Sequence, residues 1–344
     1  MSKSGFPHLV LNGSPAEQGR QYGVALREPI REVWDFYATR MFYPLGLTDA
    51  HIYRFAAGVR EALLSFNPIL ADEIEGMAAG ARVDSWKVYA LNARSELMNY
   101  PRSECTTVFF PETGILAQTW DWIEPLEEWA VLVTRHDADG RKSITFGEPG
   151  MVGKVGMNSS GLGMCLNFLF APIKEIGVPL HCVAREPLHC TDFTAAKAVL
   201  QRSGIGKAGH LLLASSSGEY LSVEYAGDSR LELDAQQRAF VHTNHFIGGS
   251  ALDDAVDVPG SRERFERART MVDDASSLTL ETAKRMLLDK TQGDHSINCD
   301  YHQDPALGDL RVGTIASIVM DLGSQTMHVK RGNSVDDNFA SITL

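Results

Sequence analysis

The sequence predicts an α+β protein in which helical blocks and β-rich blocks alternate. Apolar residues recur at helical spacing through much of the first hundred residues, in particular over 50–81 and 84–99. From position 105 the pattern changes to short β-rich segments, which glycine, proline or Asp-Gly turns separate. Helical patterns return at about 191–203 and in two runs within 261–290. Alternation of this kind is typical of layered α+β folds.

The first predicted element is a strand, and the helix after it has a strong start signal. Residues 8–13 (HLVLNG) have the pattern of a short strand that ends in a turn. Ser14 can cap the following helix, Pro15 suits its first turn, and Glu17 completes a capping box. Apolar residues then continue at helical spacing as far as Tyr37. We therefore predict a helical N-terminal region.

The segments after position 105 predict several blocks of strands. The runs are TTVFF (106–110), ILAQTW (115–120), WAVLVTRH (129–136), SITFGE (143–148), KVGMN (154–158), GLGMCLNFLF (161–170), HLLLASSS (210–217), EYLSVEYA (219–226), SRLELD (229–234), AFVHTNH (239–245), RVGTIASIVMDL (311–322) and TMHVKR (326–331). Asp139-Gly140 is a good hairpin turn. No repeat and no linker interrupts the pattern, so we predict a single unit over residues 1–344.

Composition argues against several classes of protein. The chain has 344 residues with 44% apolar content, which is enough to bury a large core. The net charge is −12 and no Lys/Arg run reaches five residues, so we expect no nucleic-acid or anionic-membrane partner. No apolar run approaches the roughly 18 residues of a membrane span, and the N-terminus lacks the apolar region of a signal peptide. Five cysteines, an odd and sparse set, favour a reducing cytoplasm.

Three motifs have weak functional interpretations. GIGKAG at 204–209 matches G-x-G-x-x-G, but a predicted helix precedes it and a predicted strand follows, which reverses the order of a dinucleotide site. HCVAREPLHC at 181–190 offers two His-Cys pairs, and His295, Cys299 and His302 form a second cluster. Neither spacing is typical of zinc. We therefore expect no metal and no cofactor.

Cys105 is the strongest candidate for chemistry, although its local pattern leaves several roles open. It stands in SECTTVFF (103–110), at the start of a predicted strand. A buried free cysteine is most often an inert, small apolar residue. Asn167 and Asn244 are by the same reasoning turn or capping residues. The residues alone leave packing, a disulfide, a metal ligand or a nucleophile as interpretations of Cys105.

The sequence resembles the peptidase family of acyl-coenzyme A:6-aminopenicillanic acid acyltransferase and its linear-amide hydrolase relatives, which are N-terminal nucleophile hydrolases. The resemblance extends over nearly the whole chain. It is carried by LNGSPAEQGRQYG, ECTTVFF, AQTWDW, GMNSSGLGMCLNF, GHLLLASSSGEYLSVEYA, TNHF, SRERFERA, DHSINCDYH and TIASIVMDL. Each piece is weak alone, but their order and spacing together are specific.

The resemblance implies a fold and a maturation step. The fold is a four-layer αββα sandwich with two stacked, mainly antiparallel sheets. The chain would be made as an inactive precursor that cuts its own Glu104–Cys105 bond. The products would be residues 1–104, a mostly helical α chain, and residues 105–344, a β chain. The two would remain an α/β heterodimer, which can assemble further.

The resemblance also implies roles for four residues. Cys105 would attack the acyl carbonyl, and its new α-amino group, with an ordinary pKa of about 7.7–8.0, would serve as general base. Asp121 matches the family's carboxylate near the nucleophile and would hold the α-ammonium. Asn244 matches the family's oxyanion-stabilising asparagine. Asn167 resembles the second such group of bile-salt hydrolase relatives.

The remaining candidates concern the substrate. Trp120 and Trp122 would make the pocket apolar. Arg262 and Arg264 could present a guanidinium to a substrate carboxylate, or could lie on a solvated or structural helix face. Related bile-salt hydrolases carry an arginine at the position of Gln118, so this departure argues against a bile-salt substrate.

We interpret the chain as a self-processing cysteine hydrolase that cleaves a linear, non-peptide amide of a small N-acyl compound through an acyl-thioester on Cys105. An acyltransferase that moves an acyl group from a thioester or amide to an amine is an alternative. A second hypothesis keeps the chain uncut and pairs Cys105 with His245 as base. A third is an inactive binding or scaffold protein of the family.

Overall fold

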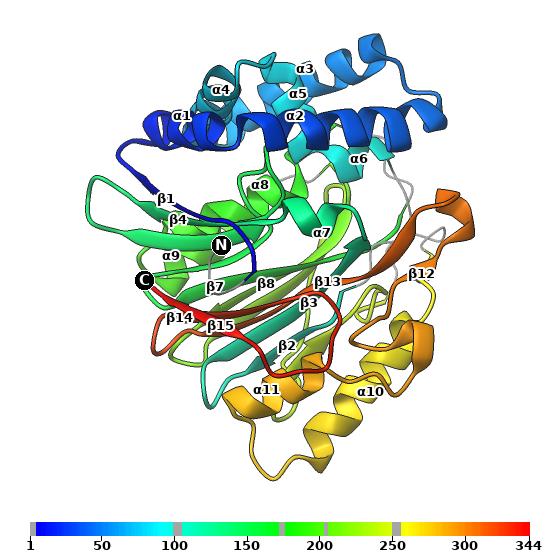
Figure 1. Ribbon diagram of the computed structural model, residues 1–344. Helices are drawn as coiled ribbons and strands as arrows, with labels where there is room; N and C mark the ends of the chain where they lie inside the picture. Colours follow the sequence, from blue (N-terminus) through cyan, green and yellow to red (C-terminus); the bar gives the residue numbers. More distant parts are fainter. Residues whose placement is uncertain (1–4, 99–104, 172–175, 203–205, 250–255) are drawn as a thin grey trace.

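The computed structural model describes most of the chain as two β-sheets with helices around them (Figure 1). The described residues are 5–98, 105–171, 176–202, 206–249 and 256–344. Glu104, and with it the predicted cleavage bond, lies outside the described residues. Among the helices of these ranges, none combines the length and apolarity that crossing a membrane requires.

The first sheet has the strand order β1-β4-β5-β6-β7-β8-β9-β10. Its strands are β1 (His8–Asn12), β4 (Val131–His136), β5 (Lys142–Gly147), β6 (Val155–Asn158), β7 (Leu162–Phe168), β8 (Ala208–Ser215), β9 (Tyr220–Ala226) and β10 (Ser229–Glu232). Neighbouring strands are antiparallel, except for the parallel pair β1 and β4. The predicted turn at Asp139-Gly140 joins β4 to β5, and Gly140 has a φ of 89°, which glycine adopts without steric cost.

The second sheet has the order β11-β2-β3-β13-β14-β15, and all its pairs are antiparallel. Its strands are β2 (Thr107–Phe110), β3 (Ile115–Ile123), β11 (Phe240–His242), β13 (Arg311–Asp321), β14 (Thr326–Arg331) and β15 (Ala340–Thr343), and β12 (His302–Gln303) pairs with β13. Every residue of β3 is buried, because one face packs toward the first sheet and the other toward helices.

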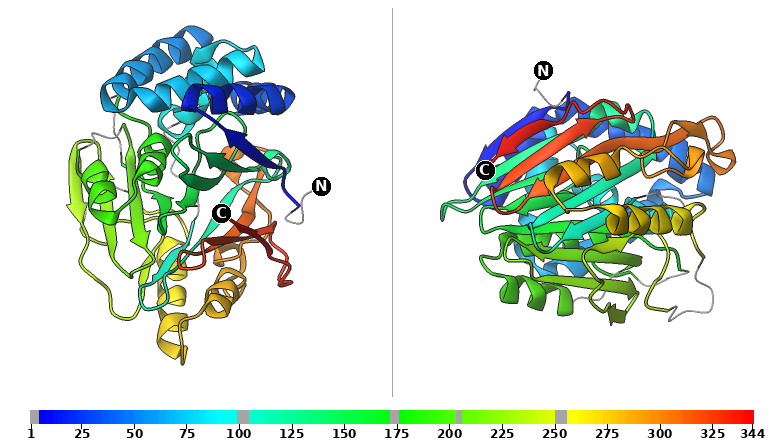
Figure 2. Two further views of the ribbon diagram at one scale, coloured as in Figure 1. Left: turned by 90° about the vertical axis from the view of Figure 1, so that its left-hand side faces the viewer. Right: turned by 90° about the horizontal axis from the view of Figure 1, so that it is seen from below.

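The two sheets pack face to face between two layers of helices (Figure 2). Gln118 on β3 exchanges hydrogen bonds with the backbone of Leu166 on β7, which ties one sheet to the other. The outer helices are α8 (Leu180–Arg185) and α9 (Phe193–Gln201) on the first sheet, and α10 (Ser261–Asp274) and α11 (Leu280–Leu287) on the second. The predicted αββα sandwich is therefore confirmed.

The N-terminal helices form a separate layer at one end of the sandwich, drawn blue to cyan in Figure 1. They are α1 (Pro15–Ala25), α2 (Arg27–Phe36), α3 (Asp49–Phe66), α4 (Pro68–Ala81), α5 (Ser85–Asn92) and α6 (Arg94–Met98), and the short α7 (Leu126–Trp129) lies further along the chain. The predicted capping box of Ser14 and Glu17 is confirmed, with both hydrogen bonds present. The single helix predicted over 50–81 is two helices, because Asn67 is extended and caps a new helix that begins at Pro68.

A buried polar network joins the N-terminal helices to the sandwich. The Tyr37 hydroxyl accepts hydrogen bonds from Arg94 (2.8 Å) and from the indole N–H of Trp122 (2.9 Å), and it donates to Glu148 (2.8 Å). Arg94 and Glu148 also form an ion pair whose side chains are almost fully buried. Removing either partner of such a pair would leave an uncompensated buried charge, so the network fixes the helices on the sandwich.

Candidate active site

Cys105 lies two residues before the start of β2 and is fully buried, and polar groups from distant parts of the chain surround its backbone. Its N–H donates to Oδ1 of Asn244 at 2.8 Å. Its carbonyl oxygen accepts from Nδ2 of Asn167 at 3.2 Å and from Nη1 of Arg264 at 3.1 Å. Four of the residues singled out from the sequence therefore converge on one point between the sheets.

Asn244 follows β11, and both ends of its side chain are held. Its Oδ1 accepts from Cys105 and from both terminal nitrogens of Arg264, each at 3.2 Å. One hydrogen of its amide NH₂ goes to the carbonyl oxygen of Phe168 at 2.9 Å. Its backbone N–H donates to the hydroxyl of Ser261, the first residue of α10, at 2.7 Å. The side chain is thus oriented with its oxygen toward the Cys105 nitrogen.

Asn167 on β7 is held by the strand beside it. Its Oδ1 pairs with Nδ1 of His210, the directly opposite residue of β8, at 2.9 Å, and the other ring nitrogen of His210 pairs with the Ser222 hydroxyl at 2.9 Å. Burial, together with His242 stacked at a ring distance of 3.7 Å, holds the pKa of His210 well below its usual value. A neutral imidazole that donates from Nδ1 therefore directs the Asn167 amide NH₂ toward Cys105.

The thiol of Cys105 has a cationic neighbour, Lys154. The Lys154 Nζ atom lies 3.7 Å from the sulfur and 4.3 Å from the ring centroid of Trp120. Burial raises the pKa of the thiol above its ordinary value, and the nearby Asp121 carboxylate raises this pKa further. The Lys154 ammonium and a hydrogen bond from Gln118 act in the opposite direction and lower it. The sequence pattern gave no sign of Lys154, because it is a single lysine before a short strand and lysines are mostly exposed.

Asp121 on β3 is buried and is anchored from the neighbouring strand. Its Oδ1 accepts from the hydroxyl of Thr314 at 2.5 Å, at the point where the register of β3 and β13 shifts between Thr314 and Ala316. The same hydroxyl accepts from the backbone N–H of Cys299 at 2.8 Å. Register shifts of this kind change the direction of side chains and are common next to functional sites. The DHSINCDYH motif therefore supports the position of Asp121.

The two tryptophans beside Asp121 lie in the core. Trp120 packs edge-on against Phe146 at a ring distance of 5.6 Å, and its face carries the Lys154 ammonium. Trp122 is buried and donates to Tyr37. Trp120 thus contacts a neighbour of the thiol, and Trp122 belongs to the network under the N-terminal helices.

The two arginines of α10 occupy different environments. Arg264 is fully buried, and its guanidinium donates to the Cys105 carbonyl and to Asn244. The side chain of Arg262 is 66% exposed and pairs with Asp257 at 2.7 Å. The helix therefore directs one guanidinium at the backbone of Cys105 and the other toward solvent.

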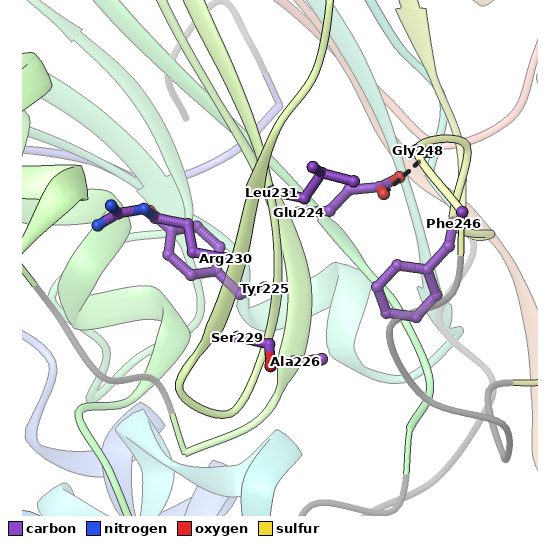
Figure 3. A pocket seen from close by; sticks show the side chains of 9 residues that line it. Glu224, Tyr225, Ala226, Ser229, Arg230, Leu231, Phe246 and Gly248 are labelled. Atoms are coloured by element: carbon purple, nitrogen blue, oxygen red, sulfur yellow. Dashed lines mark hydrogen bonds between the residues drawn. The ribbon is translucent and has the colours of Figure 1, made fainter.

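A carboxylate fixes the loop that follows Asn244. Glu224 accepts from the N–H groups of Ile247 (2.7 Å) and Gly248 (3.2 Å), and from Nε2 of His242 (2.9 Å). Figure 3 shows the Glu224 carboxylate directed at Gly248, at the edge of a pocket of about 520 Å³ between β9, β10 and this loop. The clamp holds the backbone on the C-terminal side of Asn244.

His245, the alternative base, is directed elsewhere. Its Nδ1 lies 2.8 Å from the Ser261 hydroxyl and 3.2 Å from that of Thr243. Burial is the main cause that lowers its pKa to about 4. Within the described residues, its hydrogen bonds do not include the Cys105 sulfur. The structure therefore does not form the Cys-His pair that an uncut hydrolase would need.

The two His-Cys motifs and GIGKAG are the other patterns noted in the sequence. All five cysteines are free. The sulfur of Cys299 lies 3.4 Å from Nδ1 of His302, and His189 pairs with Glu186 at 3.3 Å. In the described part of the chain, no three His, Cys, Asp or Glu side chains are grouped so that they could hold a metal. The described end of the GIGKAG motif leads directly into β8.

A family model and a relative of known name both point to one family. The model of the family "acyl-coenzyme A:6-aminopenicillanic acid acyl-transferase" matches residues 109–335. The 40 kDa form of acyl-coenzyme A:6-aminopenicillanic-acid-acyltransferase from Emericella nidulans is 26% identical over 345 residues, which cover 96% of this chain and 95% of that protein. Similar solved structures include a mutant of conjugated bile acid hydrolase from Clostridium perfringens (12% identity, 71% of this chain and 92% of that one, TM-score 0.49). Penicillin V acylase from Agrobacterium tumefaciens is another (14%, 70% and 86%, TM-score 0.38).

Proposed function

The chain belongs to the acyl-coenzyme A:6-aminopenicillanic acid acyl-transferase family, and we propose that it is a self-processing cysteine enzyme that cleaves a linear amide of a small N-acyl compound. The observation that carries the proposal is the convergence of buried groups on Cys105. Its nitrogen contacts Asn244, its carbonyl oxygen contacts Asn167 and Arg264, and its sulfur contacts Lys154. Any buried residue needs partners for its backbone N–H and carbonyl oxygen, but an inert core cysteine needs no cation at its sulfur and no side-chain amides from two distant parts of the chain.

The proposed maturation creates the general base. The Cys105 sulfur attacks the carbonyl carbon of Glu104 to give a tetrahedral intermediate. Its collapse to a thioester breaks the peptide C–N bond, and the thiol proton passes to the nitrogen of Cys105. Water then hydrolyses the thioester, which leaves a carboxylate on Glu104 and a free thiol and α-amine on Cys105. An amide nitrogen is not basic, but an α-amino group has an ordinary pKa of about 7.7–8.0. The cut thus places a base beside the nucleophile.

The two products, residues 1–104 and 105–344, would remain one α/β heterodimer. Support comes from the buried contacts of Tyr37 and Arg94, in the first product, with Glu148 and Trp122, in the second.

In the proposed catalytic cycle the α-amine takes the thiol proton, and the sulfur of Cys105 attacks the acyl carbonyl of the substrate. The Oδ1 of Asn244 already accepts from the nitrogen of Cys105 and so would orient the base. Each amide NH₂ has two donors, so Asn244 and Asn167 would each keep one contact with the protein and give the second to the oxyanion. Asp121 would hold the α-ammonium electrostatically. Arg264 would position Cys105 and Asn244.

The second half of the cycle decides between hydrolysis and transfer. The acyl group would leave the thioester for water, which we favour, or for an amine, as the name of the Emericella nidulans relative describes. N-acyl amides and acyl-thioesters are therefore the proposed substrates. We propose a cytoplasmic location, supported by the five free cysteines.

Trapping the acyl-thioester tests this function. The protein is mixed with small acyl-thioesters and N-acyl amides and quenched in acid. We expect the mass of the acyl group on the fragment that begins at Cys105, and no addition in Cys105→Ala. Adding 6-aminopenicillanic acid or another amine before the quench separates the two outcomes, because transfer gives an N-acyl product and hydrolysis a free acid. A wild-type protein that stays unmodified across the panel would favour the scaffold hypothesis.

A further inference from the structure

We propose that Lys154 is a catalytic residue of the uncut chain: its side-chain amine takes the proton of the Cys105 thiol for self-cleavage and returns it to the departing nitrogen. The inference rests on the self-processing function proposed above. It concerns the step for which the α-amino group is not available, since that group exists only after the Glu104–Cys105 bond is cut.

The geometry places Lys154 at the sulfur. Its Nζ atom is 3.7 Å from the Cys105 Sγ, within the reach of a hydrogen bond to sulfur. Its backbone N–H donates to the carbonyl oxygen of Phe146 at 3.0 Å, which fixes the start of β6. Its ammonium lies over the rings of Trp120 (4.3 Å) and Phe168 (5.2 Å). The contacts with the rings of Trp120 and Phe168 hold the amine of Lys154 beside the thiol.

The surroundings of Lys154 favour its neutral form. Within the described residues, no carboxylate lies within ion-pair distance of its Nζ atom. Burial lowers the pKa of Lys154 to about 8. About one molecule in ten then carries a neutral amine at pH 7, against roughly one in 2,500 for an ordinary lysine. The titratable and charged groups that act on it or respond to it are Arg94, Cys105, Asp121, Glu148, Cys165 and His181.

The proposed step is balanced. The thiol proton moves from Sγ to the neutral Nζ of Lys154, and the thiolate attacks the carbonyl carbon of Glu104. As the tetrahedral intermediate collapses, the C–N bond breaks and the Lys154 ammonium returns the proton to the nitrogen of Cys105. The products of this step are a thioester, a primary α-amine and a neutral lysine. Water then hydrolyses the thioester, as in the maturation proposed above.

The chain supplies a matched control for the test. Lys207 is also buried, lies 5.2 Å from the ring of Phe168 and has a pKa lowered to about 8, chiefly by burial. Its Nζ atom donates to the carbonyl oxygen of Ser95 at 2.6 Å. Lys207→Met therefore removes a similar buried cation whose hydrogen bond does not go to the thiol.

The experiment follows self-cleavage by intact mass after a short pulse of cell-free synthesis. We expect Lys154→Met to slow cleavage roughly 10²–10⁴-fold, the usual contribution of a positioned base, and Lys207→Met to change it only a few-fold. The wild-type rate should rise with pH and level off above about pH 8, since the neutral amine is the active form. Lys154→Arg keeps the charge without a usable base and should also be slow. Cleavage at the wild-type rate in Lys154→Met or Lys154→Arg would overturn the proposal.

A thiol titration keeps the test decisive if a variant folds poorly or if the wild type does not cleave. The ultraviolet absorbance of the Cys105 thiolate is obtained on uncut protein as the difference from Cys105→Ala in the same background. In folded Lys154→Met the thiol should ionise at higher pH than in Lys154→Arg, which should also stay uncut and keeps a cation beside the sulfur throughout the titration. Identical titrations would contradict the proposal. An uncut wild type whose thiol does respond to Lys154→Met would refute self-processing but not the Lys154–Cys105 contact.

Discussion

The side-chain oxygen of Asn244 accepts a hydrogen bond from the backbone nitrogen of Cys105 at 2.8 Å. This nitrogen is the one that becomes an α-amino group if the Glu104–Cys105 bond is cut. An acceptor already in place would hold the new amine beside the thiol, where a general base has to lie. On this proposal the uncut chain would orient the base before the cut creates it.

Replacing Asn244 by alanine should impair chemistry more than stability. The variant loses the contacts to Cys105, Arg264 and Phe168, and with them the proposed oxyanion donor. We expect a fall of roughly 10²–10³-fold in kcat. Asn158→Ala is the control, because Asn158 is also buried and donates to two backbone carbonyls away from Cys105.

Each of these two variants should lose about 1–3 kcal/mol of unfolding free energy in urea, since each leaves buried groups unsatisfied. Activity assays on both separate the roles. Equal losses of kcat in Asn244→Ala and Asn158→Ala would remove the special role of Asn244.

His210 should act through Asn167 as a positioning residue. His210→Phe keeps the ring that stacks on His242 but removes the donor to Asn167 Oδ1, so the amide loses its fixed orientation. We expect kcat to fall about tenfold with KM little changed, which corresponds to about 1.4 kcal/mol at the transition state. His210→Asn, whose NH₂ can replace Nδ1–H, should recover part of the rate.

A double-mutant cycle checks this route. In an Asn167→Ala background, His210→Phe should have little further effect on kcat, because the residue it orients is absent. Additive losses would show that His210 acts independently of Asn167.

His245 should contribute to acid sensitivity. Its pKa is lowered to about 4 in the folded protein and is about 6.5 when unfolded, so the unfolded chain binds more protons between these values. Protons therefore favour unfolding, and the stability that neutral His245 contributes is lost as pH falls from about 6.5 to about 4. We expect Tm to fall less steeply over this range in His245→Gln than in wild type. Parallel Tm curves would contradict the pKa shift.

Local structure was the part most predictable from the sequence, because its causes lie in neighbouring residues. The capping box of Ser14 and Glu17 and the hairpin at Asp139-Gly140 are both present as predicted. The break at Asn67 was missed although Pro68 marked it, because the apolar periodicity continues across it.

The site itself could be predicted only in part. Cys105 and Asn244 are 139 positions apart, and no local sequence pattern predicts that they are in contact. Only the resemblance to a family placed both residues in one site. The SRERFERA motif does not show which arginine is buried, since that depends on how α10 is rotated on the sheet. In the structure Arg264 is buried and Arg262 is exposed. Lys154 was missed because burial of a lone lysine depends on the aromatic residues around it.

The most direct test of the central claim is the intact mass of the purified protein under denaturing, reducing conditions, with Cys105→Ala beside it. We predict that wild type separates into residues 1–104 and 105–344 and that Cys105→Ala keeps the mass of the whole chain. Wild type that keeps the whole mass after long incubation would contradict the account, because the α-amine of Cys105 would then not exist.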